Sequence, residues 1–266
     1  MDIALVGPGR AGTAVALAST AAGHRVVSVA GRTPDAESTR VAAARFEARV
    51  VPVQFAGRGA QLVLIATPDG DIEPTAAALA QSLEPGALVL HLSGARGLDA
   101  LAPVTTGRED VRTGALHPLQ TLPSPDASLA GAWAAVAGPP EVTDLARALG
   151  MQPFTVADAD RATYHAAAVV ASNHLVALMG QVERLATAAS APFEAFQPLA
   201  KAALDNSFHH GPASALTGPV ARGDVATVRR HLAAIPDDEE PTYRALATAA
   251  HRLSGRDDPA LREVLS

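Results

Sequence analysis

Short apolar runs alternate with helix-like segments along the first part of the chain. Such runs, when bounded by turn residues, are typical of strands buried on both faces of a parallel sheet. The pattern predicts strands at 2–6, 26–30, 50–53, 62–66, 88–92, 114–116, 133–137 and 153–156. Helices are expected at 13–22, 72–82 and 141–149. Strands that alternate with helices predict an α/β fold with a doubly wound parallel sheet.

The strand signals stop after Asp158, and only helical patterns follow. Helices are expected at 160–189, 193–206, 224–234 and 242–253, with Asp160 as the N-cap of the first. We therefore predict two domains, an α/β domain at 1–157 and an all-helical domain at 158–266. The acidic run 237–240 is interpreted as a solvated loop.

Composition narrows the class of protein. The chain has 266 residues, 48% of them hydrophobic and 18% charged, as in an ordinary globular protein. Its net charge of -6 argues against nucleic-acid binding, and the absence of Cys excludes disulfides and thiolate chemistry. No apolar run approaches the roughly 18 residues of a membrane span. Because the sequence starts with a strand, we expect no signal peptide and a cytoplasmic location.

A glycine-rich turn follows the first predicted strand and opens the first helix. It matches the pattern GxGxxG with Gly7, Pro8, Gly9, Arg10, Ala11 and Gly12. In a Rossmann βαβ unit the first glycine permits a tight turn, the second lets a pyrophosphate approach, and the third lets helix and strand pack closely. The helix N-terminus then offers free N–H groups to the phosphates. The strand, helix and strand at this spacing predict dinucleotide binding.

The end of the second strand indicates which dinucleotide is preferred. NAD enzymes place a carboxylate there, whereas this chain has Arg32 and Thr33. A guanidinium suits a 2′-phosphate, so NADP is predicted, with NAD as the less favoured cofactor. Alternatively, Arg32 is a solvated loop residue and Asp35 serves as the acid.

Two further loops follow predicted strands at the same edge of the sheet. Thr67 and Pro68 come after the fourth strand, and Ser93 comes after the fifth. Ligands bind at the carboxyl ends of strands in open α/β sheets, so these residues are expected to border the nicotinamide half. The alternative is that they only form turns.

These features resemble the NAD(P)-dependent reductases that join a Rossmann domain to a helical C-terminal domain, the group of ketopantoate reductase, pyrroline-5-carboxylate reductase, prephenate dehydrogenase and 6-phosphogluconate dehydrogenase. The chain looks more closely like a bacterial branch of Rossmann-like proteins with a C-terminal domain of unknown function. The resemblance rests on three further segments, ALHPLQTL at 115–122, YHAAAVVASNHL at 164–175 and GPASALTGPVARGD at 211–224.

The resemblance implies a reductase, which needs a proton donor near the nicotinamide. Some relatives use a lysine on the first long helix of the second domain, but Lys201 is the only lysine here and His165 occupies roughly that place. At 100° per residue, His165, Ser172 and Asn173 share one side of the helix. We expect His165 to donate the proton, Asn173 to anchor the substrate and Ser172 to assist. The alternative is that these polar residues cap or cross-link neighbouring helices inside the bundle.

Other polar residues are candidates for the site. His117, at the end of a predicted strand, is the rival proton donor, or else a structural histidine. Asn206, Thr217 and Arg222 are expected to bind substrate, with Arg222 gripping a carboxylate. Arg222 alternatively pairs with Asp224 on the surface.

We expect no metal site, because adjacent His209 and His210 point in different directions and lack further ligands. The predicted function is NADP(H)-dependent reduction of a small 2-oxo acid such as ketopantoate. An imine reductase similar to pyrroline-5-carboxylate reductase and a non-catalytic NAD(P)-binding sensor are the alternatives. Apolar faces on the Ala-rich helical domain predict a homodimer.

Overall fold

A computed structural model describes residues 1–266, which form two compact units, Met1–Ser172 and Asn173–Ser266. The division falls after Ser172, beyond the predicted domain boundary at 157. The difference arises because helix α6 (Arg161–Val169) packs with the first unit. No helix combines the length and the apolarity needed to cross a membrane.

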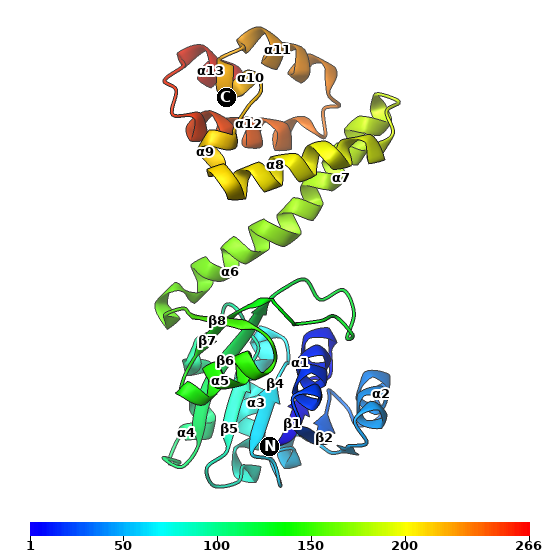
Figure 1. Ribbon diagram of the computed structural model, residues 1–266, viewed down its shortest axis with the longest axis vertical. Coiled ribbons are helices and arrows are strands. Elements are labelled where there is room, and N and C mark those ends of the chain that lie inside the picture. The colour runs from blue at the N-terminus through cyan, green and yellow to red at the C-terminus, as the bar shows by residue number, and fades with distance from the viewer. The chain divides into compact units, whose positions relative to one another are not determined.

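The first unit is built around an eight-stranded sheet (Figure 1), which confirms the predicted α/β fold. Its strands lie in the order β3-β2-β1-β4-β5-β6-β7-β8. They are β1 (Asp2–Val6), β2 (Arg25–Ala30), β3 (Arg49–Val50), β4 (Leu62–Ile65), β5 (Leu88–His91), β6 (Arg112–Leu119), β7 (Trp133–Ala137) and β8 (Gln152–Thr155). β1 lies between β2 and β4, and all three run parallel.

One strand pair departs from the predicted parallel sheet. β6 and β7 are antiparallel, with His117 opposite Ala135, whereas β8 runs parallel to β7. A parallel neighbour requires a crossover connection, usually a helix, but the segment 120–132 contains no helix. The chain therefore returns directly, and β7 enters the sheet in the opposite direction.

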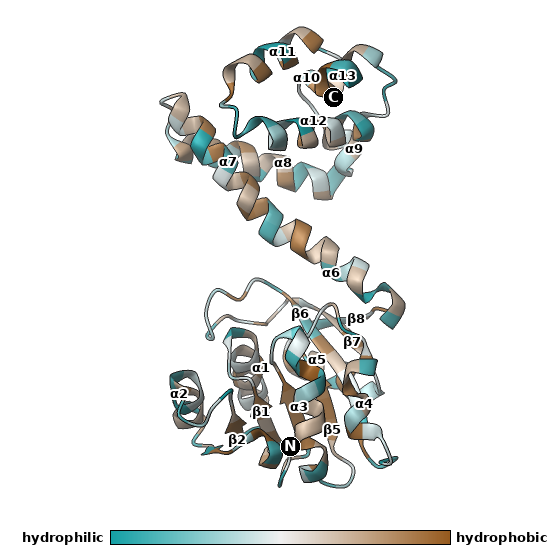
Figure 2. Cartoon of the chain, turned by 180° about the vertical axis from the view of Figure 1, so that it is seen from behind, coloured by the Kyte–Doolittle hydropathy of each residue, from teal (hydrophilic) through white to brown (hydrophobic).

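Alternation of side chains along each strand divides the core into two layers. Ile3 and Leu5 face a layer covered by α1 (Arg10–Ala21), α2 (Glu37–Arg45) and α5 (Pro140–Ala148). Ala4 and Val6 face the layer under α3 (Ile72–Leu79) and α4 (Ala102–Thr105). All four side chains are buried, and Figure 2 shows the hydrophobic colour of the strands between these helices. Helices on both faces make the sheet doubly wound.

Several elements differ from their predicted form. α2 and the C-terminal α13 (Pro259–Leu265) are additional helices that the periodicity did not predict. β6 is longer than the predicted 114–116, because pairing with β5 on one side and β7 on the other extends it through Leu119. β3 is shorter than predicted, since a 3₁₀ turn begins at Val53.

The second unit is helical, as predicted. Its helices are α7 (Leu175–Ala188), α8 (Gln197–His210), α9 (Pro212–Ala215), α10 (Pro219–Arg222), α11 (Val225–Ala234), α12 (Glu240–Ser254) and α13. A small core forms where α10, α11, α12 and α13 meet, centred on the fully buried Val228 and Leu261. Asp224 caps α11 by accepting a hydrogen bond from the N–H of Thr227, 3.0 Å away.

Three local predictions for these helices are only partly correct. The expected single helix 160–189 is interrupted by a π-helical turn at Val170–His174, and the side chain of Asp160 makes no capping hydrogen bond. The acidic run is a solvated turn at Asp237 and Asp238, but Glu239 is buried and its carboxylate forms an ion pair with Arg184. Its carbonyl also accepts a hydrogen bond from Gln181 at 3.0 Å.

Candidate active site

The three glycines of the β1–α1 turn occupy three different environments. Gly7 has φ +86°, and a Cβ there would lie 2.7 Å from the carbonyl carbon of Ala66. A Cβ on Gly12 would lie 2.6 Å from the carbonyl oxygen of Gly7 and 2.7 Å from the Cβ of Ala66. A Cβ on Gly9, in contrast, would meet nothing within 4 Å. The turn therefore packs tightly against the end of β4 at Gly7 and Gly12 and leaves open space at Gly9.

The first turn of α1 presents its N–H groups at this open position. Gly9 is the N-cap, no side chain caps the helix, and no acidic residue lies in its first turn. Backbone hydrogen bonding begins with the N–H of Thr13, which donates to Gly9 O at 2.9 Å. The amides of Arg10, Ala11 and Gly12 precede it, so the positive end of the helix dipole remains available to an anion.

Arg32 and Thr33 lie in the loop after β2, and both are exposed. Arg32 takes part in none of the ion pairs of the chain. The loop itself is fixed, because the buried Thr39 donates a hydrogen bond from Oγ1 to Thr33 O at 3.2 Å. Gly31 makes this possible, since a Cβ there would lie 2.0 Å from Thr39 Oγ1. Asp35 is also exposed.

The loops after β4 and β5 differ in how their polar groups are satisfied. Thr67 Oγ1 is buried and has no hydrogen-bond partner, whereas the neighbouring Pro68 is exposed. Ser93 Oγ accepts hydrogen bonds from the N–H groups of Ala95 and Arg96, at 3.1 and 3.0 Å. Ser93 thus stabilises the turn after β5, while Thr67 has a hydroxyl without a hydrogen-bond partner beside the glycine turn.

The two candidate histidines, His117 and His165, lie together. Their rings contact edge to face, with centroids 5.6 Å apart. A Cβ on Gly94 would lie 2.5 Å from His165 Nδ1 and 2.9 Å from His117 Cε1, so a side chain there would displace the two rings. His165 Nδ1 is buried without a hydrogen-bond partner, and His117 Nδ1 is hydrogen-bonded to the hydroxyl of Tyr164 at 2.7 Å.

A buried arginine lies beneath this cluster. Arg161 is fully buried; its Nε lies 3.3 Å from Asp158 Oδ1, and its Nη1 donates to Ser93 O at 3.3 Å. Asp158 also accepts a hydrogen bond from the N–H of Leu98 at 2.9 Å. The first turn of α6 is thereby joined to the loop after β5, which holds His165 against Gly94.

Burial and the charge of Arg161 keep two histidines neutral. Burial, then the Arg161 charge, lowers the pKa of His91 to about 4. Burial, then His165 and Arg161, lowers the pKa of His117 to about 4. His91 is held by two hydrogen bonds, because its Nδ1 accepts from Ser93 N–H and its Nε2 faces Gly97 O, both at 3.2 Å. His91 and His117 therefore carry no positive charge at neutral pH.

Sequence reasoning missed Tyr164 and Arg161. Both precede His165 on the first turn of α6, and Tyr164 opens the segment YHAAAVVASNHL. A tyrosine and an arginine at the start of a helix have no distinctive spacing. Only the packing of α6 on the sheet unit brings them to His117 and Ser93.

The remaining candidates lie elsewhere. Ser172 donates a hydrogen bond to Ala168 O at 2.7 Å, and the π-helical turn at 170–174 removes the regular spacing on which its alignment with His165 and Asn173 was predicted. In the helical unit, three exposed candidates lie on α8, before α10 and at the end of α10, namely Asn206, Thr217 and Arg222.

Two further expectations for the helical unit concern charged and metal-binding groups. Arg222 forms no ion pair, because the carboxylate of Asp224 is bonded to Thr227 instead. No group of three His, Asp or Glu side chains is placed to hold a metal ion. His209 Nδ1 lies 2.7 Å from Asp205 O, within its own helix.

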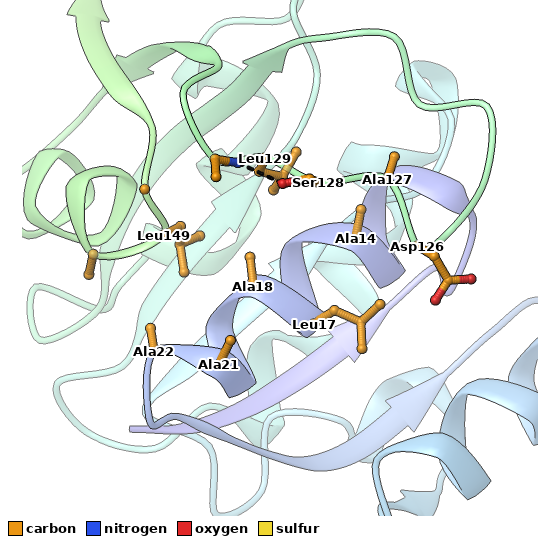
Figure 3. A pocket seen from close by; sticks show the side chains of 13 residues that line it. Ala14, Leu17, Ala18, Ala21, Ala22, Asp126, Ala127, Ser128, Leu129 and Leu149 are labelled. Carbon is orange, nitrogen blue, oxygen red and sulfur yellow. Dashed lines mark hydrogen bonds between the residues drawn. The ribbon is translucent and has the colours of Figure 1, made fainter.

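An open groove of about 430 Å³ lies along α1, away from its N-terminus (Figure 3). Ala14, Leu17, Ala18 and Ala21 line it from the helix, and Leu129 and Leu149 line it from two loops. Its one charged residue, Asp126, is paired with Arg45. The groove therefore offers no group for acid–base chemistry.

Comparison with protein families agrees with this architecture. Residues 1–123 match the Rossmann-like domain, and residues 134–250 match the domain of unknown function DUF2520. The chain thus combines a Rossmann-like domain with a DUF2520 domain. No curated protein sequence matches it.

Solved structures share the fold across both units. BF3122 from Bacteroides fragilis, named as a candidate NADP oxidoreductase, is 23% identical, with a TM-score of 0.78 over 94% of this chain and 98% of that one. Protein TM1727 from Thermotoga maritima is 20% identical, with a TM-score of 0.74 over 96% and 99%. The imine reductase from Myxococcus stipitatus in complex with NADP+ is 17% identical, with a TM-score of 0.64 over 100% and 99%.

The buried histidines predict how stability depends on pH. Because the pKa of His91 and His117 is about 4 in the folded chain and the ordinary pKa of histidine is 6.5, the unfolded chain takes up protons first as the pH falls. The free energy of unfolding should therefore decrease from pH 6.5 toward pH 4, by an amount on the order of 3 kcal/mol for the fully buried His91. Urea unfolding at several pH values measures this decrease.

The variant His91→Gln should show a shallower decrease over that interval, because one buried imidazole no longer has to become charged. His210→Gln, which changes an exposed histidine at the end of α8, is the matched control. An equal pH dependence in the His91→Gln and wild-type chains would contradict the assignment.

Proposed function

We propose that the chain is an NADP(H)-dependent oxidoreductase. The observation that carries the proposal is the glycine turn, where Gly7 and Gly12 close against β4 and Gly9 opens on the uncapped N-terminus of α1. This arrangement suits a pyrophosphate, whose oxygens accept hydrogen bonds from the first amides of the helix. The loop after β2, which contains Arg32 and Thr33, then lies on the adenosine side of the cofactor.

The preference for NADP rests on the loop after β2. Arg32 is exposed and unpaired, so its guanidinium is available to a 2′-phosphate in two parallel hydrogen bonds. The Myxococcus stipitatus imine reductase, which shares the fold, is in complex with NADP+, and a variant of it is in complex with NAD+. Thr67 Oγ1, buried and without a partner, is a suitable donor to the cofactor at the end of β4.

The histidine cluster lies on the nicotinamide side of the sheet. β6 is three strands from β1 in the sheet, so His117 is about 14 Å from the glycine turn along the sheet edge. An extended dinucleotide spans this distance. In the reduction, the cofactor supplies a hydride to the substrate carbon. The cluster holds the substrate heteroatom and supplies the proton.

The charge of the cluster favours a carbonyl substrate, such as a small 2-oxo acid of the ketopantoate type. No carboxylate is hydrogen-bonded to His117, Tyr164 or His165, and the buried Arg161, although paired with Asp158, still acts as a positive charge on His117 by lowering its pKa. A positive potential stabilises the negative charge that develops on a carbonyl oxygen and opposes a protonated imine. Imine reduction is the second candidate because an imine reductase and a 1-pyrroline-5-carboxylate reductase share the fold.

We also propose that the helical unit forms a homodimer. α8 has 14 residues and none of them is buried, and a helix of this length is marginal in water without packing. Leu199 and Phe208 on α8 are 68% and 84% exposed, and Val176 on α7 is 72% exposed. A second copy of the chain is the partner that would bury these apolar side chains.

NADPH oxidation in the presence of small 2-oxo acids and cyclic imines tests the reaction. Turnover is expected with a 2-oxo acid, and turnover with imines alone would favour the second candidate. Tight NADPH binding without turnover of any substrate would indicate a sensor.

The control variant for this assay is Gly9→Val. Gly9 has φ -82°, and no atom lies within 4 Å of a Cβ added there, so the fold should persist. The valine would fill the space assigned to the pyrophosphate and should abolish NADPH binding. A Gly9→Val chain that binds NADPH as tightly as the wild type would overturn the assigned cofactor site.

The cofactor preference is tested with Arg32→Ala. Loss of a charge-assisted contact worth roughly 1.5–3 kcal/mol should weaken NADPH binding by at least about tenfold while leaving NADH binding almost unchanged. Titration calorimetry with both cofactors measures the ratio of affinities. Asp35→Asn is the companion variant. A loss of NADH affinity in Asp35→Asn, with an unchanged ratio in Arg32→Ala, would contradict the preference for NADP.

The dimer is tested with Phe208→Glu, which places a charge in the proposed apolar interface. Sedimentation at micromolar concentration should show a dimer for the wild-type chain and a monomer for the variant. Val41→Glu, at a 59% exposed position on α2, is the control and should leave the dimer intact. A monomeric wild-type chain would exclude this proposal.

A further inference from the structure

Tyr164 is held in one orientation at the histidine cluster. Its hydroxyl is hydrogen-bonded to His117 Nδ1 at 2.7 Å, and the two rings meet edge to face with centroids 5.7 Å apart. On its other side the ring contacts Phe154 on β8, with centroids 5.8 Å apart. The hydroxyl is thus fixed by packing from two strands, while the residue stays partly exposed.

The two ring nitrogens of His117 have different surroundings. Nδ1 faces the Tyr164 hydroxyl, whereas Nε2 has no protein partner and is not among the buried unpaired atoms of the chain. Nε2 therefore keeps contact with solvent, next to the bare backbone of Gly94. His117 connects the hydroxyl of Tyr164 to water through its ring.

His165 differs from His117 at its Nδ1. Its Nδ1 is buried against Gly94 and has no hydrogen-bond partner. No neighbouring group is placed to replace a proton lost from that nitrogen. His165 instead contacts the ring of His117 and helps to fix its plane.

The protonation states agree with this geometry. Burial raises the pKa of the Tyr164 hydroxyl, so it carries its proton at neutral pH. His117 is neutral there because burial, His165 and Arg161 lower its pKa to about 4. A neutral imidazole bears one N–H and one free nitrogen, which is the form that passes a proton through the ring.

We propose that Tyr164 donates the proton to the reduced substrate and that His117 replaces this proton from solvent. The inference rests on the proposed reductase function and assigns the acid within it. A bound nicotinamide would supply the hydride of the new C–H bond, and Tyr164 supplies the proton of the new O–H bond, whose electron pair is the former π pair of C=O. The tyrosine oxygen takes the proton of His117 Nδ1–H, and His117 Nε2 takes one from water. The net reaction consumes one hydride and one proton.

The variant Tyr164→Phe tests the donor, because it removes the hydroxyl and keeps the ring between His117 and Phe154. We expect kcat to fall by about a hundredfold or more, with unchanged NADPH affinity. The chain contains its own matched control. Tyr243, the other tyrosine, has its hydroxyl 2.7 Å from His231 Nδ1 in the helical unit, with the rings edge to face. Tyr243→Phe removes an equivalent hydrogen bond and should leave kcat within about twofold.

The relay role of His117 is tested with His117→Asn and His117→Ala. The asparagine amide can donate a hydrogen bond toward Tyr164 but cannot pass a proton through its side chain. We expect a lower kcat with an unchanged KM and a larger solvent deuterium isotope effect in His117→Asn. Added imidazole should restore part of kcat in His117→Ala, which a purely structural role would not allow.

The outcomes separate this proposal from the proposed function. Wild-type turnover that persists in Tyr164→Phe would overturn the proton path and leave the reductase function intact. Loss of turnover in Tyr164→Phe with normal kcat and isotope effect in His117→Asn would overturn the relay. A wild-type chain that turns over none of the substrates would overturn the reductase function and the proton path together.

Discussion

The close approach of the β1–α1 turn to the end of β4 is the contact on which the site depends. Positions that a Cβ would occupy on Gly7 and Gly12 are already taken by Ala66 and by the backbone of the turn itself. A side chain at either glycine would force α1 away from the sheet. With both glycines present, the helix packs directly on β1 and directs its uncapped N-terminus to the carboxyl edge of the strands.

A second junction of the same kind forms at the end of β5. Gly94 touches His117 and His165, and a Cβ on Gly97 would lie 2.9 Å from the carboxylate of Asp158. The fully buried Arg161 joins these parts, because it reaches both Asp158 and Ser93. Its charge has an electrostatic consequence, since it helps to keep His91 and His117 neutral. The same side chain thus shapes the loop and sets its potential.

The two junctions offer different chemical groups at the carboxyl edge of the sheet. The glycine turn on β1 offers backbone amides and no side chain, which suits a ligand that brings its own negative charge. The β5–β6 side offers imidazoles and a phenol, which suit proton transfer. Thr67 lies between them with an unused hydroxyl. A dinucleotide bound across these strands would have its pyrophosphate at the glycine turn and its nicotinamide beside the groups that suit proton transfer.

The sequence alone determined the α/β fold, the glycine turn and the change to helices, because apolar periodicity and GxGxxG are local patterns that depend on backbone geometry. It also identified His117 and His165 separately. The tertiary structure decided that they touch, that Tyr164 and Arg161 join them, and that Ser93 forms a turn. It also decided that β7 runs antiparallel and that a π-helical turn interrupts the helix after α6. These features arise from contacts between residues distant in the chain, or from one extra residue in a helical turn, and neither has a local sequence pattern.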